Sequence, residues 1–140
     1  MGKCFDKESS FALEKIEEYI CDELNDSLLY AELAKMARPC NAKILNQMSA
    51  EEEMHSKKWL NAYQLIACMK YIPKKACRPK LDPCFYDILK ERYAEETEDY
   101  HEYTMFSEQF DDDEGLSKLA MNLAADEQRH ADWILDMLVT

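Results

Sequence analysis

Glycine and proline are scarce in this chain of 140 residues, which contains two glycines and four prolines. Both residue types are disfavoured inside helices, so their scarcity, together with 47% hydrophobic residues, favours long helices. An all-β fold is not expected on the same grounds. The length suits a single domain spanning residues 1–140.

Basic residues are also few: 17 Lys and Arg stand against 29 Asp and Glu, for a net charge of -12. Binding to nucleic acid or to an anionic membrane requires the opposite sign, so we expect neither as a partner. Cations are the natural partners of such a chain. There is no run of 18 apolar residues and no charged-then-apolar leader, so we expect a cytoplasmic protein that neither spans a membrane nor is secreted.

A Cys-x-x-Cys motif is missing, although the chain contains six cysteines. Without that spacing, neither a rubredoxin-type site nor a zinc ribbon is encoded. A reducing compartment fits best, with the thiols as buried fillers or bystanders. The six positions are Cys4, Cys21, Cys40, Cys68, Cys77 and Cys84.

Apolar residues recur at alternating spacings of three and four in four stretches, which predicts helices over about 10–37, 42–69, 84–110 and 114–138. The first and third links are short. The second link, between Lys70 and Pro83, contains three of the four prolines and is expected to lack regular structure. Sustained seven-residue spacing favours near-parallel packing of helices. The sequence therefore predicts an all-α four-helix bundle of two antiparallel helical hairpins joined by a long crossover.

Each predicted helix carries one glutamate within its own apolar stripe, and the second and fourth stripes also contain a histidine three residues later. Residues three apart on a helix share a face. Burying four ionised carboxylates without partners would cost far more than the typical net stability of about 5–15 kcal/mol. Two divalent cations would balance the four charges, with two neutral imidazoles completing the ligand set. The expected metal ligands are Glu23, Glu52, His55, Glu96, Glu127 and His130.

The two halves of the chain resemble each other in spacing. Glu23 is followed seven residues later by Tyr30, and Glu96 is followed seven later by Tyr103. The Glu-x-x-His motif begins 29 residues after the glutamate in the first half and 31 after it in the second. Each tyrosine is two helical turns from its glutamate on the same face, where its phenol could hydrogen-bond a ligand carboxylate. The alternative is that both tyrosines are core aromatics.

This ligand pattern resembles that of ferritin-like di-iron carboxylate proteins, in which two helices each give a Glu and two each give Glu-x-x-His. Within that superfamily the chain is most similar to the four-helix domain of the rubrerythrins. The residues that carry the resemblance are Glu23 with Tyr30, Glu52–His55, Tyr103 and Ala125–Ala131.

The resemblance implies two iron ions that reduce hydrogen peroxide or react with oxygen, with Tyr30 and Tyr103 orienting the ligands. Manganese or zinc would also suit oxygen and nitrogen ligands. Because the chain shows no four-cysteine rubredoxin site, we expect its electrons to come from an external donor such as a rubredoxin. We expect a homodimer. The alternatives are a ferritin-like ferroxidase or iron-binding protein, and a bundle that holds metal without catalysis.

Many rubrerythrins have a bulged third helix that brings an additional glutamate to the metals, which leaves two possibilities here. Glu96 is the ligand if the helix is unbroken, whereas Glu95 and Glu98 are the ligands if a one-residue π-bulge lies before Tyr103. The unbroken register favours Glu96.

Overall fold

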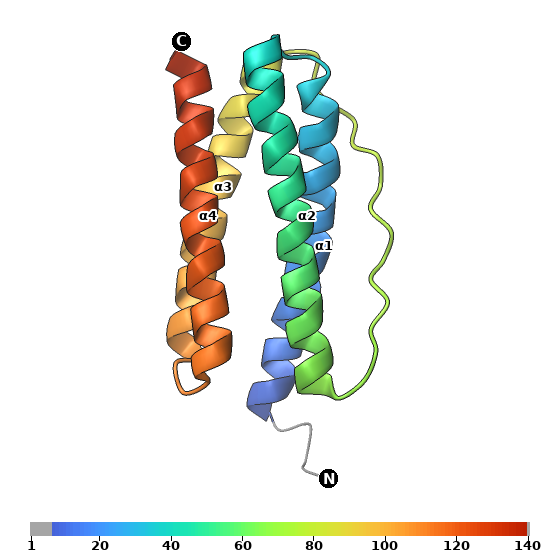
Figure 1. Ribbon diagram of the computed structural model, residues 1–140, viewed down its shortest axis with the longest axis vertical. Helices are drawn as coiled ribbons and strands as arrows, with labels where there is room; N and C mark the ends of the chain where they lie inside the picture. The colour runs from blue at the N-terminus through green and yellow to red at the C-terminus, as the bar shows by residue number, and fades with distance from the viewer. Residues whose placement is uncertain (1–6, 140) are drawn as a thin grey trace. The chain divides into compact units, whose positions relative to one another are not determined.

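The computed structural model describes residues 7–139, which form four long α-helices and, within that range, no β-strand. The helices are α1 (Lys7–Ala34), α2 (Pro39–Ala67), α3 (Phe85–Gln109) and α4 (Glu114–Val139). Helices α1 and α2 form one antiparallel hairpin, and α3 and α4 form another (Figure 1). The all-α class with four helices in two hairpins is confirmed.

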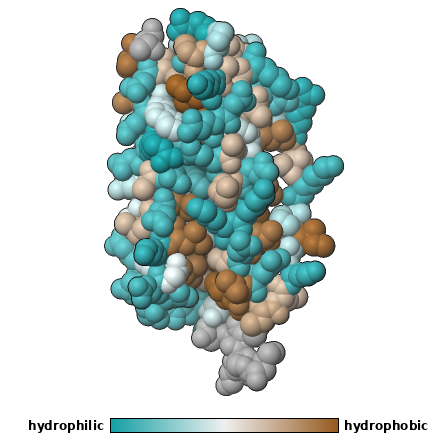
Figure 2. Space-filling model, in the orientation of Figure 1, coloured by the Kyte–Doolittle hydropathy of each residue, from teal (hydrophilic) through white to brown (hydrophobic). Residues whose placement is uncertain are grey.

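Hydrophilic side chains dominate the face drawn in Figure 2, with apolar side chains scattered among them. This agrees with a charged fraction of 33% and a net charge of -12. None of the helices within residues 7–139 is long and apolar enough to cross a bilayer.

The link between α1 and α2 differs in detail from the predicted break at residues 38–41. Helix α1 already ends at Ala34, and α2 begins at Pro39. The backbone N–H of Ala42 donates to the carbonyl of Arg38 at 2.8 Å, which closes the first turn of α2 around the proline. Proline is well suited to this position, because the first N–H groups of a helix have no partner within it and the ring fixes φ at a helical value.

Aspartate side chains accept backbone hydrogen bonds just before α3 and at the start of α4. The backbone N–H of Cys84, just before α3, donates to the carboxylate of Asp82 at 2.8 Å. The carboxylate of Asp113 accepts the backbone N–H of Leu116 at 3.0 Å at the start of α4. A negative charge at a helix N-terminus also interacts favourably with the helix dipole.

A reciprocal pair of serines joins the two helices of each hairpin. The hydroxyl of Ser27 donates to the carbonyl of Ser49 at 2.8 Å, and that of Ser49 donates to the carbonyl of Ser27 at 2.7 Å. Ser107 and Ser117 make the same two bonds between α3 and α4, at 2.8 and 3.0 Å. Because a serine side chain reaches only a short way, these bonds require the two backbones to approach closely. They fix the register in which the helices of each hairpin face one another.

The apolar stripes are buried in both hairpins. The largest contributors in α1 and α2 are Trp59, Tyr30, Ile16, Ile20, Leu33, Leu45 and Met48, and those in α3 and α4 include Leu89, Phe106, Leu123 and Ile134. Burying a side chain of this size contributes about 1.5–3 kcal/mol relative to leaving it exposed. The stripes hold the polar residues between them in fixed positions.

The connection between the hairpins has no regular structure from Lys70 to Asp82, yet it is anchored to α1 and α2. The ring of Tyr71 packs against that of Tyr63 with centroids 4.5 Å apart, and the backbone N–H of Tyr71 donates to the side chain of Gln64 at 3.1 Å. Farther along, Arg78 pairs with Glu32 at 2.9 Å. The connection therefore follows the first hairpin between these two anchors.

Cys68, directly after α2, has the left-handed backbone conformation, with φ of 58°. A side chain with a Cβ atom disfavours this region by about 1–2 kcal/mol, whereas glycine adopts it freely. Relief of this strain should stabilise Cys68→Gly, while the greater entropy of glycine in the unfolded chain offsets part of the gain. We expect a net increase of about 0.5 kcal/mol in the free energy of unfolding, measured by urea denaturation. Cys40→Gly, in the first turn of α2, is the matched control and should not stabilise the protein. Destabilisation by Cys68→Gly would contradict the prediction.

The sequence left two interpretations of the cysteines open, as buried fillers or as bystanders. Cys21, Cys40, Cys68, Cys77 and Cys84 are all exposed and carry free thiols, so the interpretation of these five as buried fillers is wrong. Cys21 and Cys40 lie on exposed faces of α1 and α2, and the other three lie between α2 and α3. None of the five belongs to an apolar stripe. Cys4 lies outside the described residues.

Candidate metal centre

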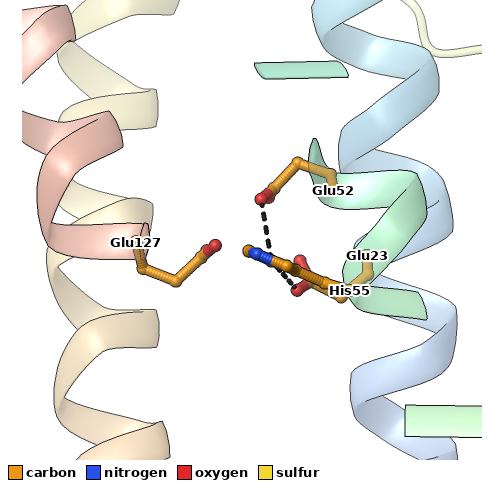
Figure 3. A group of neighbouring side chains, drawn as sticks. All are labelled: Glu23, Glu52, His55 and Glu127. Atoms are coloured by element: carbon orange, nitrogen blue, oxygen red, sulfur yellow. Dashed lines mark hydrogen bonds and ion pairs between the residues drawn. The ribbon is translucent and has the colours of Figure 1, made fainter. Parts of the chain in front are cut away.

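Helices α1 and α2 bring together three of the predicted ligands. Glu23 comes from α1, and Glu52 and His55 come from successive turns of α2; all three are fully buried. The Nδ1 atom of His55 lies 2.8 Å from Oε2 of Glu23 and 3.3 Å from Oε1 of Glu52. Figure 3 shows these three side chains pointing toward one another. We refer to Glu23, Glu52 and His55 as the first half-site.

The electrostatics of the first half-site favour a bound cation. Burial raises the pKa of Glu23 well above its ordinary value, and the nearby charge of Glu52 raises it further, although the hydrogen bond with His55 acts in the opposite direction. The Oε1 atom of Glu23 is buried and accepts no hydrogen bond from any residue within 7–139. A buried carboxylate in these surroundings is stabilised either by a proton or by a positive ion.

Helices α3 and α4 repeat the arrangement. Glu96 comes from α3, Glu127 and His130 come from α4, and all three are fully buried. The Nδ1 atom of His130 lies 3.7 Å from Oε2 of Glu96 and 3.7 Å from Oε1 of Glu127. We refer to these three residues as the second half-site.

Each half-site has the composition and spacing of a metal-binding group. Within each, the three residues offer ligand atoms that all lie within 4.8 Å of one another. Two carboxylates and one imidazole are ligands that iron and manganese accept well, and zinc would also bind them. The residues present therefore fit a metal. The structure distributes the six predicted ligands evenly, with three in each hairpin.

The third helix is unbroken. Every residue of α3 from Phe85 to Gln109 is α-helical, with no π turn. Glu96 is fully buried beside His130, whereas Glu95 and Glu98 are exposed. The geometry thus favours Glu96 over the bulged alternative.

Tyr30 and Tyr103 occupy equivalent places in the two hairpins. Both are buried in the stripes of α1 and α3, two helical turns beyond Glu23 and Glu96 respectively. Their burial agrees with a position inside each hairpin on the same face as the glutamate. Their orienting role stays a prediction.

Arg92 is a buried residue beside the second half-site that the sequence did not lead us to expect. It is only 7% exposed, and its Nη2 atom lies 3.7 Å from Oε1 of Glu96. Its position four residues before Glu96 puts it on the same helix face, which is a signal that could have revealed it. The corresponding residue of the first hairpin, four before Glu23, is Tyr19. The two half-sites therefore differ in one charge.

An all-α chain whose paired helices bury two sets of Glu, Glu and His has the features of the ferritin-like class of metal-carboxylate proteins. Residues 87–140 match the family model described as Rubrerythrin, which confirms the resemblance to that family over this segment. The segment covers nearly all of α3 and the whole of α4, and so includes the second half-site. No curated protein and no solved structure matches the chain.

Proposed function

We propose that this chain is a non-haem di-iron protein that reduces hydrogen peroxide with electrons from an external donor. The observation that carries the proposal is the repetition of a fully buried Glu, Glu and His set on both hairpins, with the second set inside the segment that matches the Rubrerythrin model. In this proposal Glu23, Glu52, His55, Glu96, Glu127 and His130 together hold two iron ions.

Charge balance supports two metal ions. The four buried glutamates carry four negative charges when ionised, and two divalent cations supply the same positive charge. In each half-site the Nδ1 atom of the histidine is the ring nitrogen that faces the carboxylates, so it is the expected ligand atom. Iron binding would then take the place of the proton that burial favours on Glu23.

In the proposed reaction, the metals and the protein have different roles. Two iron ions, when bound, supply the two electrons that cleavage of the peroxide O–O bond requires. The protein fixes the ligand atoms by placing them on packed helices and keeps bulk water away from them through burial. Tyr30 and Tyr103 orient ligand carboxylates.

The reaction is tested by loading the protein with ferrous iron under anaerobic conditions and following oxidation with stopped-flow absorbance. We expect about two iron ions per chain, and oxidation by hydrogen peroxide that is at least about tenfold faster than oxidation by oxygen at equal concentration. Fast oxidation by oxygen with slow oxidation by peroxide would instead identify a ferroxidase. Iron that binds but reacts with neither oxidant would identify a non-catalytic metal protein.

A further inference from the structure

Four aromatic side chains form a series in the first hairpin. The rings of Tyr71 and Tyr63 have centroids 4.5 Å apart, and those of Tyr19 and Trp59 have centroids 5.0 Å apart. Tyr63 follows Trp59 by four residues on α2, so these two side chains are neighbours on one helix face. One turn of α2 therefore connects the Tyr71–Tyr63 pair to the Tyr19–Trp59 pair.

The series begins at the first half-site and ends at the protein surface. Trp59 follows His55 by four residues, and Tyr19 precedes Glu23 by four, so both rings are one turn from a half-site residue. Tyr19 and Trp59 are buried, whereas Tyr63 and Tyr71 are partly exposed. Each residue of the series is of a type that can lose one electron.

A carboxylate accompanies the two outer tyrosines. The hydroxyl of Tyr63 donates to Oε2 of Glu17 at 3.4 Å, and the charge of Glu17 also acts on the phenol of Tyr71. Burial, followed by the charge of Glu17, raises the pKa of both phenols, so each phenol keeps its proton until it is oxidised. Glu17 is positioned to accept that proton, because an oxidised phenol is a strong acid.

We propose that Tyr19, Trp59, Tyr63 and Tyr71 carry single oxidising equivalents from the first half-site to the surface. This inference rests on the proposed iron binding and assigns a protective role to the first hairpin. Electron transfer slows exponentially with distance, so several short steps between adjacent rings are faster than one long step. The path removes an oxidant before it damages the buried ligands.

The path operates when only one ferrous ion is bound and hydrogen peroxide is the oxidant. Cleavage of the O–O bond needs two electrons, of which the ion supplies one and a tyrosine of the series supplies the other. The peroxide takes up two protons from solvent, so that one ferrous ion, one hydrogen peroxide, one tyrosine and a net one proton give one ferric ion, one tyrosyl radical and two water molecules. The phenolic proton passes to Glu17 and then to solvent.

The second hairpin differs at the corresponding positions. On α3, the residue that corresponds to Tyr19 is Arg92, which has no aromatic ring. Trp133 lies near His130, with ring centroids 5.7 Å apart, but the guanidinium of Arg129 sits 5.1 Å from the centroid of its indole. A cation over an aromatic ring disfavours removal of an electron from that ring. The path therefore belongs to the first hairpin.

Freeze-quench electron paramagnetic resonance tests the path without depending on turnover. The full chain is loaded anaerobically with one equivalent of ferrous iron, mixed with hydrogen peroxide in the absence of a donor, and frozen. We expect a tyrosyl radical signal in the parent protein. Tyr63→Phe with Tyr71→Phe should lower its intensity at least fivefold, and Trp59→Phe should lower it as well. Tyr86→Phe, which alters an exposed tyrosine of α3, is the matched control and should leave the signal unchanged.

Peptide mass spectrometry after the same reaction supplies a second readout, because oxidation products should accumulate at Tyr63 and Tyr71. Tyr71→Phe alone, in the connection, provides a variant with little risk to folding. Iron that binds to the parent protein with a radical signal that is the same in the double variant would overturn the path and leave the proposed function intact. Absence of iron binding would overturn both.

Discussion

Replacing Glu52 with glutamine is expected to stabilise the metal-free protein and to weaken iron binding strongly. Glutamine keeps the shape of the side chain but removes the negative charge that raises the pKa of Glu23. Without iron, relief of this repulsion should add about 1 kcal/mol to the free energy of unfolding. With iron, loss of a charged ligand should lower the affinity at least about 100-fold, or about 2.7 kcal/mol, since changes in residues that merely support ligands already cost 10–100-fold.

Urea denaturation with and without a chelator measures the first effect, and competition with a chelator of known affinity measures the second. Glu53→Gln is the matched control, because Glu53 is the next residue along α2 and is exposed, with Lys57 3.4 Å away. It should change the free energy of unfolding by less than about 0.5 kcal/mol and leave iron affinity as it was. A Glu52→Gln variant that behaves like Glu53→Gln would show that Glu52 is not a ligand.

The metal-free protein is expected to lose stability as the pH rises above the ordinary pKa of a glutamate. The pKa of Glu23 is raised in the folded state, so between the unfolded and folded values the folded protein binds more protons than the unfolded chain. The free energy of unfolding then falls with increasing pH, by up to about 1.4 kcal/mol per pH unit for one proton, and levels off above the folded pKa. Below the ordinary value the contribution of Glu23 is fully present.

Denaturation at several values between about pH 5 and pH 8 measures this dependence, and Glu23→Gln isolates the contribution of the one carboxyl. The free energy of unfolding of the parent should fall relative to that of the variant as the pH rises, because only the parent has the titrating carboxyl. Iron affinity should show the opposite trend, because the metal binds the deprotonated carboxylate and competes with the proton. A difference between parent and variant that is constant over this range would mean that Glu23 titrates normally.

The helices and the registers of their buried glutamates could be predicted from the sequence because both depend on a local repeat. Once the stripe of α2 includes Leu45 and Met48, helical spacing alone puts Glu52 and His55 on the buried face. The same spacing placed Glu96 rather than Glu95 or Glu98 inside. The start of α2 was less predictable, because Pro39 can end one helix or begin the next.

Contacts between residues distant in the sequence could not be predicted in this way. The Ser27–Ser49 pair and the contact between the rings of Tyr71 and Tyr63 depend on how a link folds back, which no repeat encodes. Arg92 was missed for another reason: a charged residue next to an apolar stripe is normally assigned to the surface. Its burial becomes understandable only beside Glu96.

The first hairpin has Tyr19 where the second has Arg92, so the two half-sites lie in different electric fields. A fixed guanidinium 3.7 Å from Glu96 partly cancels the negative field of the second half-site, whereas the first half-site has a neutral phenol in that place. With iron bound as proposed, lower negative charge around an ion favours its ferrous state, so we expect an ion near Glu96 to have the higher reduction potential. In a half-oxidised protein, the ferric charge would then be localised on the side of Glu23 and the remaining electron on the side of Arg92.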